Sequence, residues 1–487
     1  MLIKVFGAAV QGIDATLITI EVNSSRGCMF YLVGLPDSAV KESHQRIISA
    51  LQVNGYRMPT SNIVINMAPA DIRKEGAAYD LPLAIGILAA SEVIQSDKLE
   101  RYLLMGELSL DGSLQPIKGA LPIAIKAREL GFEGMIVPQQ NAHEAAVVNN
   151  LKVYGAGNIK EVIEFFNGTQ ELTPTLVNTR EEFYSQQSNF DFDFAEVKGQ
   201  ENVKRALEVA ASGSHNILLI GSPGSGKSML AKRLPSILPP LSLGESLETT
   251  KIHSVAGKLG KDGGLISKRP FRDPHHTIST VAMTGGGSFP QPGEISLAHN
   301  GILYLDELPE YSRNVLEVLR QPLEDRKITV SRIRCNVEYP ASFMLVASMN
   351  PCPCGYYNHP TKACVCNPGQ VQRYLNRISG PLLDRIDIQI EIVPVPFEKI
   401  SEKQPAESSA SIRERVICAR KMQEKRFANH PGVYCNAQME SRLLHLYAEP
   451  DEQGLNLLRN AMTRLNLSAR AYDRILKVAR TIADLDH

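Results

Sequence analysis

Gly221-Ser222-Pro223-Gly224-Ser225-Gly226-Lys227-Ser228 matches the pattern G-x-x-x-x-G-K-[ST] and directly follows the apolar run 217–220. Glycines let the backbone fold around an anion with its N–H groups pointing inward. In such a loop Lys227 reaches the outer phosphates and the Ser228 hydroxyl is a magnesium ligand. The stretch predicts a strand, a loop and a helix that bind a nucleoside triphosphate with Mg²⁺. A glycine-rich turn with a purely structural role is the alternative.

A second apolar run, 301–305, ends in the adjacent carboxylates Asp306 and Glu307. Beside a phosphate loop, Asp306 would hold the magnesium through water, and Glu307 would orient and deprotonate the attacking water. Carboxylates also follow strands as ordinary solvated residues. The prediction of a hydrolytic site therefore depends on the pairing with the phosphate loop.

A third apolar run, 343–349, ends in Asn350, whose side chain is suited to contact a γ-phosphate or the attacking water. Three buried strands that converge on one nucleotide are typical of an additional-strand ATPase. The sequence thus predicts an α/β fold for the nucleotide-binding core.

Composition is that of a globular chain without a dominant charge. The 487 residues suggest about three domains, and 43% of them are hydrophobic, which is enough to form large cores. Lys plus Arg and Asp plus Glu both number 52, so any nucleic-acid contact must come from local patches. The N-terminus lacks a charged-then-apolar leader and no apolar run is long enough to span a bilayer. We expect a cytoplasmic protein without a membrane partner.

Four of the eight cysteines form the pattern C-x-C-x₉-C-x-C immediately after Asn350. They are Cys352, Cys354, Cys364 and Cys366. In a reducing cytosol such thiolates are better suited to hold a metal than to form disulfides, and four thiolates suit tetrahedral Zn²⁺. The spacing is tighter than the usual C-x₂-C, and His359 is an alternative ligand. Reduced cysteines in a proline-rich turn are the other interpretation.

The chain divides by composition into four parts. Residues 1–168 mix strand and helix patterns in an α/β module, and residues 169–192 are polar and are interpreted as a linker. The nucleotide-binding core covers 193–397. Residues 398–487 begin with a polar hinge and continue as a mostly helical tail.

The chain resembles the magnesium-chelatase-like AAA+ family, in its competence-protein (ComM/YifB) subfamily, almost from end to end. The motifs that carry the resemblance are Arg269-Pro-Phe-Arg272-Asp-Pro-His275-His276-Thr-Ile-Ser279, Asn350-Pro-Cys-Pro-Cys-Gly355, Leu382-Leu-Asp-Arg-Ile-Asp387 and Ser468-Ala-Arg470-Ala-Tyr-Asp-Arg474. The resemblance implies an ATP-driven homohexameric helicase that acts on single-stranded and branched DNA. It also implies branch migration during natural transformation, alongside other recombination proteins.

Further site residues follow from the same resemblance. Arg385 would be an arginine finger that enters the neighbouring subunit's site, where such a cation accelerates hydrolysis by about 10³–10⁵-fold. Local pairing of Arg385 with Asp384 or Asp387 is the alternative. Arg470 and Arg474 share one helix face at i,i+4 spacing. One of them would sense the γ-phosphate from a helical lid, and we favour Arg470, although both could be solvated surface residues.

The N-terminal part resembles the Lon-protease fold without its chemistry. The stretch that corresponds to the nucleophile is Lys74-Glu-Gly-Ala-Ala78-Tyr-Asp80, so Ala78 replaces the serine. Ile123 occupies the position of the partner lysine, with Lys118 and Lys126 out of register. Without a hydroxyl or thiol nucleophile, serine–lysine chemistry cannot start. We interpret residues 1–168 as a non-proteolytic module for DNA contact or ring assembly.

Two insertions offer cations for DNA phosphates. The first, residues 251–298, is rich in lysine, arginine and glycine, and the second, 326–339, has the pattern of a hairpin with Arg332 and Arg334 near its tip. Contacts of this kind would be sequence-independent and sensitive to salt, whereas isolated surface cations are usually only solvated. His275 and His276, if they lay in a strand, would point to opposite faces. That arrangement favours a structural or regulatory role over a metal site.

Three other functions remain open from sequence alone. A magnesium-chelatase motor would use the same ATPase but needs partner subunits with an acidic, metal-binding domain. A Lon-like protease is disfavoured by Ala78. An ATP-binding scaffold would have no need of Glu307, Asn350 and Arg385 together.

Overall fold

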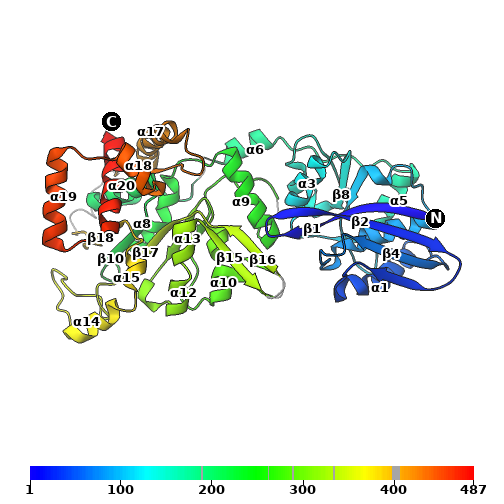
Figure 1. Cartoon of the computed structure of the whole chain (residues 1–487), viewed down its shortest axis with the longest axis horizontal. Helices are drawn as coiled ribbons and strands as arrows, with labels where there is room; N and C mark the ends of the chain where they lie inside the picture. Colours follow the sequence, from blue (N-terminus) through cyan, green and yellow to red (C-terminus); the bar gives the residue numbers. More distant parts are fainter. Residues whose placement is uncertain (188–189, 261–262, 288–289, 333–334, 397–405, 487) are drawn as a thin grey trace. The chain divides into compact units, whose positions relative to one another are not determined.

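The structure is a computed structural model that describes residues 1–487 except 188–189, 261–262, 288–289, 333–334, 397–405 and 487. The chain forms two compact units. The first contains residues 1–185 and 243–266, and the second contains residues 186–242 and 267–487. Figure 1 labels the elements of both. The mixed α/β architecture expected from the sequence is confirmed.

The first unit is built on a seven-stranded sheet in the order β3-β4-β2-β1-β5-β8-β9. Its strands are β1 (Leu2–Gln11), β2 (Asp14–Ser25), β3 (Phe30–Val33), β4 (Asn62–Ala68), β5 (Tyr102–Leu104), β8 (Gly134–Pro138) and β9 (Lys152–Ala156). The β1–β2 hairpin is antiparallel, whereas β5, β8 and β9 run parallel, so the sheet is mixed. Strands β6 (Glu107–Leu108) and β7 (Leu114–Gln115) form a separate ribbon.

Helices cover this sheet and bury its apolar side chains. They are α1 (Ser38–Val53), α2 (Asp80–Ala90), α3 (Ala120–Glu129), α4 (Gln139–Ala146), α5 (Ile159–Asn167) and α6 (Thr179–Gln186). Helix α2 packs against β1 and β2, and every one of its residues is buried. A helix that is apolar on all sides belongs in a core. Helix α6 and the bridge between Tyr154 and Pro174 lie inside the stretch interpreted as a linker, so part of that stretch is ordered on this unit.

The first unit also receives a segment from the middle of the nucleotide-binding sequence. Helix α9 (Leu243–Ala256) packs against α3. The buried Glu144 carboxylate accepts hydrogen bonds from the Leu121 amide at 3.0 Å and from the Ser254 hydroxyl. Lys251, at the start of the first insertion, forms an ion pair with Asp14 at 3.2 Å. This part of the insertion is therefore a structural element of the first unit.

The second unit contains a five-stranded parallel sheet in the order β11-β14-β17-β10-β18. Its strands are β11 (Phe271–Arg272), β14 (Ile302–Leu305), β17 (Met344–Met349), β10 (Ile217–Gly221) and β18 (Ile388–Ile392). The strand that ends before Asn350 lies between the phosphate-loop strand and the acidic strand, as an additional-strand arrangement requires. Strands β14 and β17 are buried along their whole length, which is typical of parallel strands covered on both faces.

Helices and short ribbons surround this sheet. They are α7 (Glu201–Gly213), α8 (Lys227–Arg233), α10 (Thr280–Thr284), α11 (Glu294–Leu297), α12 (Arg313–Glu317), α13 (Arg320–Asp325), α14 (Pro368–Leu375) and α15 (Gly380–Leu383), with strands β12 (Gly285–Gly286), β13 (Gln291–Pro292), β15 (Lys327–Arg332) and β16 (Cys335–Pro340). Strands β15 and β16 pair antiparallel and confirm the expected hairpin. Arg332 ends β15, but Arg334 lies outside the described residues.

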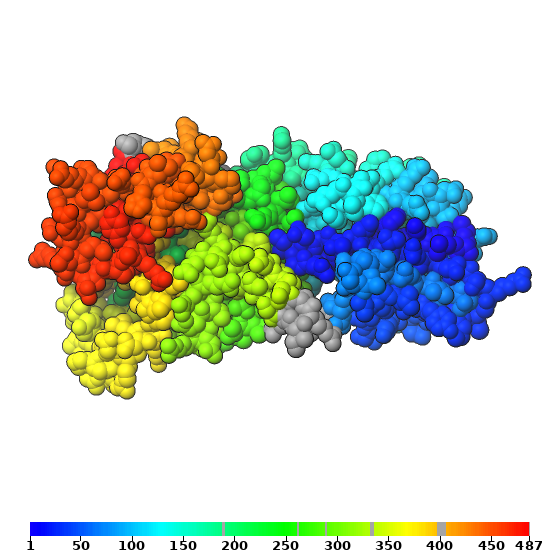
Figure 2. Space-filling view, in the orientation of Figure 1, coloured from blue at the N-terminus to red at the C-terminus, as the bar shows by residue number. Residues whose placement is uncertain are grey.

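The C-terminal tail is helical and packs on the core of the second unit. It contains α17 (Ser409–Phe427), α18 (Ser441–Tyr447), α19 (Glu452–Leu465) and α20 (Ala469–Asp486). Helices α17 and α20 both pack against α7, and His215 hydrogen-bonds Thr481 at 2.7 Å. Buried Asp484 accepts hydrogen bonds from Arg426 and Asn436. Figure 2 shows the tail in orange and red on the surface of this unit.

None of the helices within the described ranges combines the length and the apolar character needed to cross a membrane.

Candidate nucleotide site and cysteine cluster

The phosphate loop connects β10 to α8, as the sequence predicts. Gly224 (φ 78°) and Gly226 (φ 92°) adopt backbone conformations that favour glycine. Lys227 begins α8 and donates hydrogen bonds to the carbonyls of Gly221 (2.7 Å) and Ser222 (2.9 Å). Burial lowers the pKa of the Lys227 ammonium, and the charges of the nearby carboxylates only partly offset this. Its partners belong mainly to its own loop, so phosphate oxygens can replace them without breaking the fold.

The two residues predicted to hold Mg²⁺ lie together at the ends of their elements. The Ser228 hydroxyl donates a hydrogen bond of 2.9 Å to Asp306, at the end of β14. The Ser348 hydroxyl, from β17, also donates to Asp306. Burial alone would raise the pKa of Asp306, but the hydrogen bonds from Ser348 and Ser228 outweigh it and hold the pKa below its usual range. Asp306 is therefore a carboxylate at neutral pH, with oxygen donors that suit Mg²⁺.

Glu307 is held in a left-handed backbone conformation with φ 53°. This conformation is strained for any residue other than glycine, and strained residues of this kind cluster at functional sites. Its N–H lies 3.1 Å from an Asp306 carboxylate oxygen and 3.3 Å from the Ser348 hydroxyl. Its own carboxylate remains 58% exposed, with His276 Nδ1 3.8 Å away. The backbone is therefore anchored while the side chain is accessible to water.

The two histidines do not behave as the sequence analysis expected. They follow β11 in a loop rather than lying in a strand, so the alternation that would separate them does not apply. The rings of His275 and His276 have their centroids 4.1 Å apart, and the prediction of opposite faces is wrong. The sequence pattern does not predict the contact between His276 and Glu307, because the two residues follow different strands, β11 and β14, and are far apart in the chain.

Asn350 joins the phosphate loop from the neighbouring strand. Its side-chain oxygen accepts a hydrogen bond of 3.1 Å from Lys227. The structure thus brings together the predicted Lys227, Ser228, Asp306, Glu307 and Asn350.

The four clustered cysteines also converge. The distances between sulfur atoms are 3.3 Å for Cys352–Cys354, 3.7 Å for Cys352–Cys364 and 3.6 Å for Cys354–Cys364. Together with Cys366, all four sulfurs lie within 4.8 Å of one another. Four sulfurs at about 2.3 Å from one Zn²⁺ would be about 3.8 Å apart, so the set fits this metal.

His359 is occupied within the same loop. Its Nδ1 accepts hydrogen bonds from the amides of Thr361 (3.2 Å) and Lys362 (3.1 Å). The alternative of a histidine ligand is therefore not supported by this geometry.

The predicted finger arginine has a local partner that the sequence analysis did not consider. Arg385 forms an ion pair with Glu324 and donates a hydrogen bond to the Pro381 carbonyl. Asp387 instead accepts a hydrogen bond from the Asn216 amide, and Asp384 pairs with Arg474 at 3.6 Å.

The two candidate sensor arginines differ in their surroundings. Arg474 donates hydrogen bonds to the carbonyls of Leu383 (3.2 Å) and Ile386 (2.7 Å), whereas Arg470 is exposed at the start of α20. Arg474 therefore joins the tail to the Arg385 segment, and Arg470 is the side chain left accessible.

The stretch 74–80 and Ile123, predicted to correspond to a serine–lysine site, lie in the first unit. Lys74 is buried and donates a hydrogen bond to the Pro69 carbonyl. Asp80 is fully buried and accepts hydrogen bonds of 2.7 and 2.9 Å from Arg46. Ala78 packs against the hydrophobic core, and Ile123 is buried within it. These residues are used in packing.

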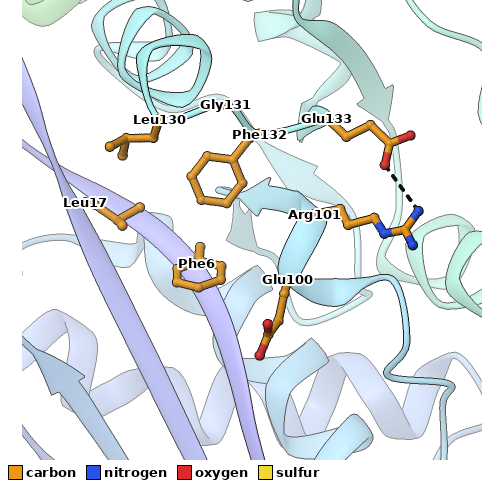
Figure 3. A pocket seen from close by; sticks show the side chains of 8 residues that line it. All are labelled: Phe6, Leu17, Glu100, Arg101, Leu130, Gly131, Phe132 and Glu133. Atoms are coloured by element: carbon orange, nitrogen blue, oxygen red, sulfur yellow. Dashed lines mark ion pairs between the residues drawn. The ribbon is translucent and has the colours of Figure 1, made fainter.

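A separate pocket lies entirely in the first unit (Figure 3). Phe6 and Phe132 line it with their rings edge to face at 5.3 Å, and the Arg101–Glu133 pair closes one side at 3.6 Å. It is lined by none of the residues predicted for the nucleotide site.

Three family profiles match successive parts of the chain. Residues 193–400 match the profile described as "Magnesium chelatase, subunit ChlI", and residues 20–141 match "Subunit ChlI of Mg-chelatase". Residues 406–487 match "Magnesium chelatase, subunit ChlI C-terminal".

Individual relatives cover nearly the whole chain. Competence protein ComM of Haemophilus influenzae is 42% identical over 484 residues, which is 99% of this chain and 93% of the relative. YifB of Escherichia coli is 44% identical over 488 residues, covering 98% of this chain and 92% of the relative. The magnesium-chelatase 38 kDa subunit of Rhodobacter capsulatus is 26% identical over 179 residues, 33% of this chain. The chain therefore belongs to the magnesium-chelatase-like AAA+ family, in the subfamily of ComM and YifB.

Proposed function

We propose that this protein is an ATP-dependent DNA motor, a helicase that promotes branch migration during recombination in natural transformation. The observation that carries the ATPase part is the convergence of Lys227, Ser228–Asp306, Glu307 and Asn350 at the ends of neighbouring parallel strands. The DNA part is supported by family membership and by the name of the Haemophilus relative, a competence protein.

ATP would be bound by the loop amides of residues 221–228, with Lys227 exchanging its carbonyl partners for phosphate oxygens. Ser228 and Asp306 would hold Mg²⁺, which neutralises charge on the phosphates. Glu307 would accept a proton from the attacking water, and Asn350 would orient that water or the γ-phosphate. These groups follow three neighbouring strands: Lys227 and Ser228 come after β10, Asp306 and Glu307 after β14, and Asn350 after β17.

We further propose a homohexameric ring in which Arg385 enters the neighbouring subunit's site as a finger. Arg385 would exchange its ion pair with Glu324 for the γ-phosphate of that neighbour. Arg470 would sense the γ-phosphate from the helical tail, which acts as a lid. A cation in this position stabilises the charge of the transition state.

DNA would be contacted from the hairpin β15–β16. The proposed contact residues are Arg332, which ends β15, and Arg334, which lies outside the described residues. The first unit, as a Lon-like domain, would act as a non-proteolytic module. The proposed partners are single-stranded and branched DNA and other recombination proteins, in the cytoplasm. The cysteine cluster would hold a structural Zn²⁺, as its sulfur spacing supports.

A magnesium-chelatase motor is the second candidate. It is supported by the matches to chelatase subunit profiles, but the 38 kDa subunit shares only 26% identity over a third of this chain.

The decisive experiment is ATP-driven branch migration on a labelled three-strand junction. Wild-type protein should resolve the junction, and Glu307→Gln should bind ATP and leave the junction intact. Glu310→Gln is the matched control, since Glu310 is a nearby carboxylate that pairs with Arg377 at 2.8 Å. Wild-type protein that hydrolyses ATP but does not move the junction would exclude the DNA function and favour the chelatase-type motor.

A further inference from the structure

The cysteine cluster lies in a long irregular segment. Residues 350–367 connect β17 to α14 without helix or strand. Irregular loops of this length within a compact domain are uncommon and usually functional. Helix α14 begins with a capping box between Asn367 and Gln370, immediately after Cys366. Figure 2 shows this yellow segment at the surface of the second unit.

The loop contacts the phosphate loop at two points. A Cβ on Gly355 would lie only 2.4 Å from Cδ of Pro223, so the loop backbone rests directly on the phosphate loop. Its first residue, Asn350, bonds Lys227 at 3.1 Å. The cysteine loop therefore touches the phosphate loop at both Pro223 and Lys227.

We propose that one Zn²⁺ is bound by Cys352, Cys354, Cys364 and Cys366, and that ATP turnover by this protein depends on the bound metal. This inference rests on the proposed ATPase function. The metal cross-links residues 352–354 to residues 364–366 and so fixes the loop between Asn350 and α14. Because binding a structural metal is coupled to folding of its ligands, loss of the metal releases the loop. Asn350 and Pro223 then lose the support that positions them.

The expected effect is on turnover more than on nucleotide affinity. Misplacement of a positioning group by about 1 Å costs about 10²-fold in rate. Most of the proposed phosphate contacts come from the backbone amides of residues 221–228. The cysteine loop does not supply these amides. Metal-free protein should therefore bind a fluorescent ATP analogue with similar affinity but hydrolyse ATP about 10²-fold more slowly.

The test uses the full chain and begins with elemental analysis. Wild-type protein should contain one equivalent of zinc, and the double variant Cys354→Ser/Cys366→Ser should contain none and turn over slowly. The matched control is Cys28→Ser/Cys418→Ser, which alters two exposed cysteines outside the cluster and should keep zinc and turnover. His359→Ala should also keep zinc. To separate metal loss from misfolding, chelated wild-type protein should regain turnover when Zn²⁺ is returned.

Wild-type protein without stoichiometric zinc would overturn the inference. So would a chelated, folded protein that hydrolyses ATP at the wild-type rate. If the zinc-loaded protein hydrolyses ATP but does not move DNA junctions, the DNA function fails while this inference stands. If it hydrolyses no ATP, both fail.

Discussion

Two groups of charged residues in this protein have opposite uses. In the stretch 74–80 of the first unit, Lys74 and Asp80 are fully buried and bonded to Pro69 and Arg46. In the second unit, the Lys227 ammonium bonds carbonyls of its own loop, and the Glu307 carboxylate is 58% exposed. A charged residue is available for chemistry when a ligand can replace its partners. When its partners hold the core together, it is structural.

The backbone shows the same contrast. In the first unit, the left-handed position before Ala77 is occupied by Gly76 (φ 78°), which adopts it at little cost. In the second unit, the left-handed position is Glu307 itself, where a side chain is required despite the strain. Of these two positions, only the one beside the nucleotide site carries a side chain in a strained conformation.

The largest effect is expected for the charged residues of the second unit that are proposed to act on the nucleotide. Arg385→Ala should lower the kcat for ATP hydrolysis by about 10³-fold or more, with nucleotide affinity retained, because a finger acts on the transition state. Steady-state ATPase assays and analogue binding measure the two quantities. Glu324→Gln removes the same ion pair but keeps the arginine, and it should stay active. Equal losses in both variants would mean that the pair is only structural.

The second largest effect is expected for the buried charged residues of the first unit. Asp80→Asn should destabilise the first unit by about 3 kcal/mol, because it leaves the Arg46 charge without its buried partner. Urea unfolding measures this, and Glu133→Gln, which breaks an exposed pair with Arg101, should cost less than about 1 kcal/mol. Binding of the ATP analogue should not change. Weakened nucleotide binding without lost stability would contradict the structural role.

The variant His276→Ala tests whether His276 restrains the exposed carboxylate of Glu307. A partly exposed pair is worth at most about 1 kcal/mol, so freeing Glu307 should raise basal kcat by no more than about fivefold. ATPase assays without DNA measure this. His275→Ala is the control, since His275 bonds Thr277 rather than Glu307. A fall in kcat would show that His276 helps to position the base.

The smallest effect is expected for Ala78→Ser. Adding a hydroxyl should change stability by about 0.5 kcal/mol and produce no peptide cleavage, because Lys74 is bonded to Pro69 and the predicted counterpart of the partner lysine is the buried Ile123. A fluorescent casein assay checks this outcome. Measurable cleavage would show that the first unit retains protease geometry.

Sequence by itself determined the parts of the site that depend on neighbouring residues. The phosphate loop, the strand that ends at Asp306 and Glu307, and the strand that ends at Asn350 are all local patterns. Parallel strands place their carboxyl ends at one edge of a sheet, so the convergence of these residues could also be predicted.

Tertiary structure alone decided the contacts between segments far apart in the sequence. It placed residues 243–266 in the first unit, His276 beside Glu307, and Glu324 against Arg385. It also brought the cysteine loop onto Pro223. Local patterns cannot specify such contacts, because they depend on how complete elements pack and on which side chains are buried between them.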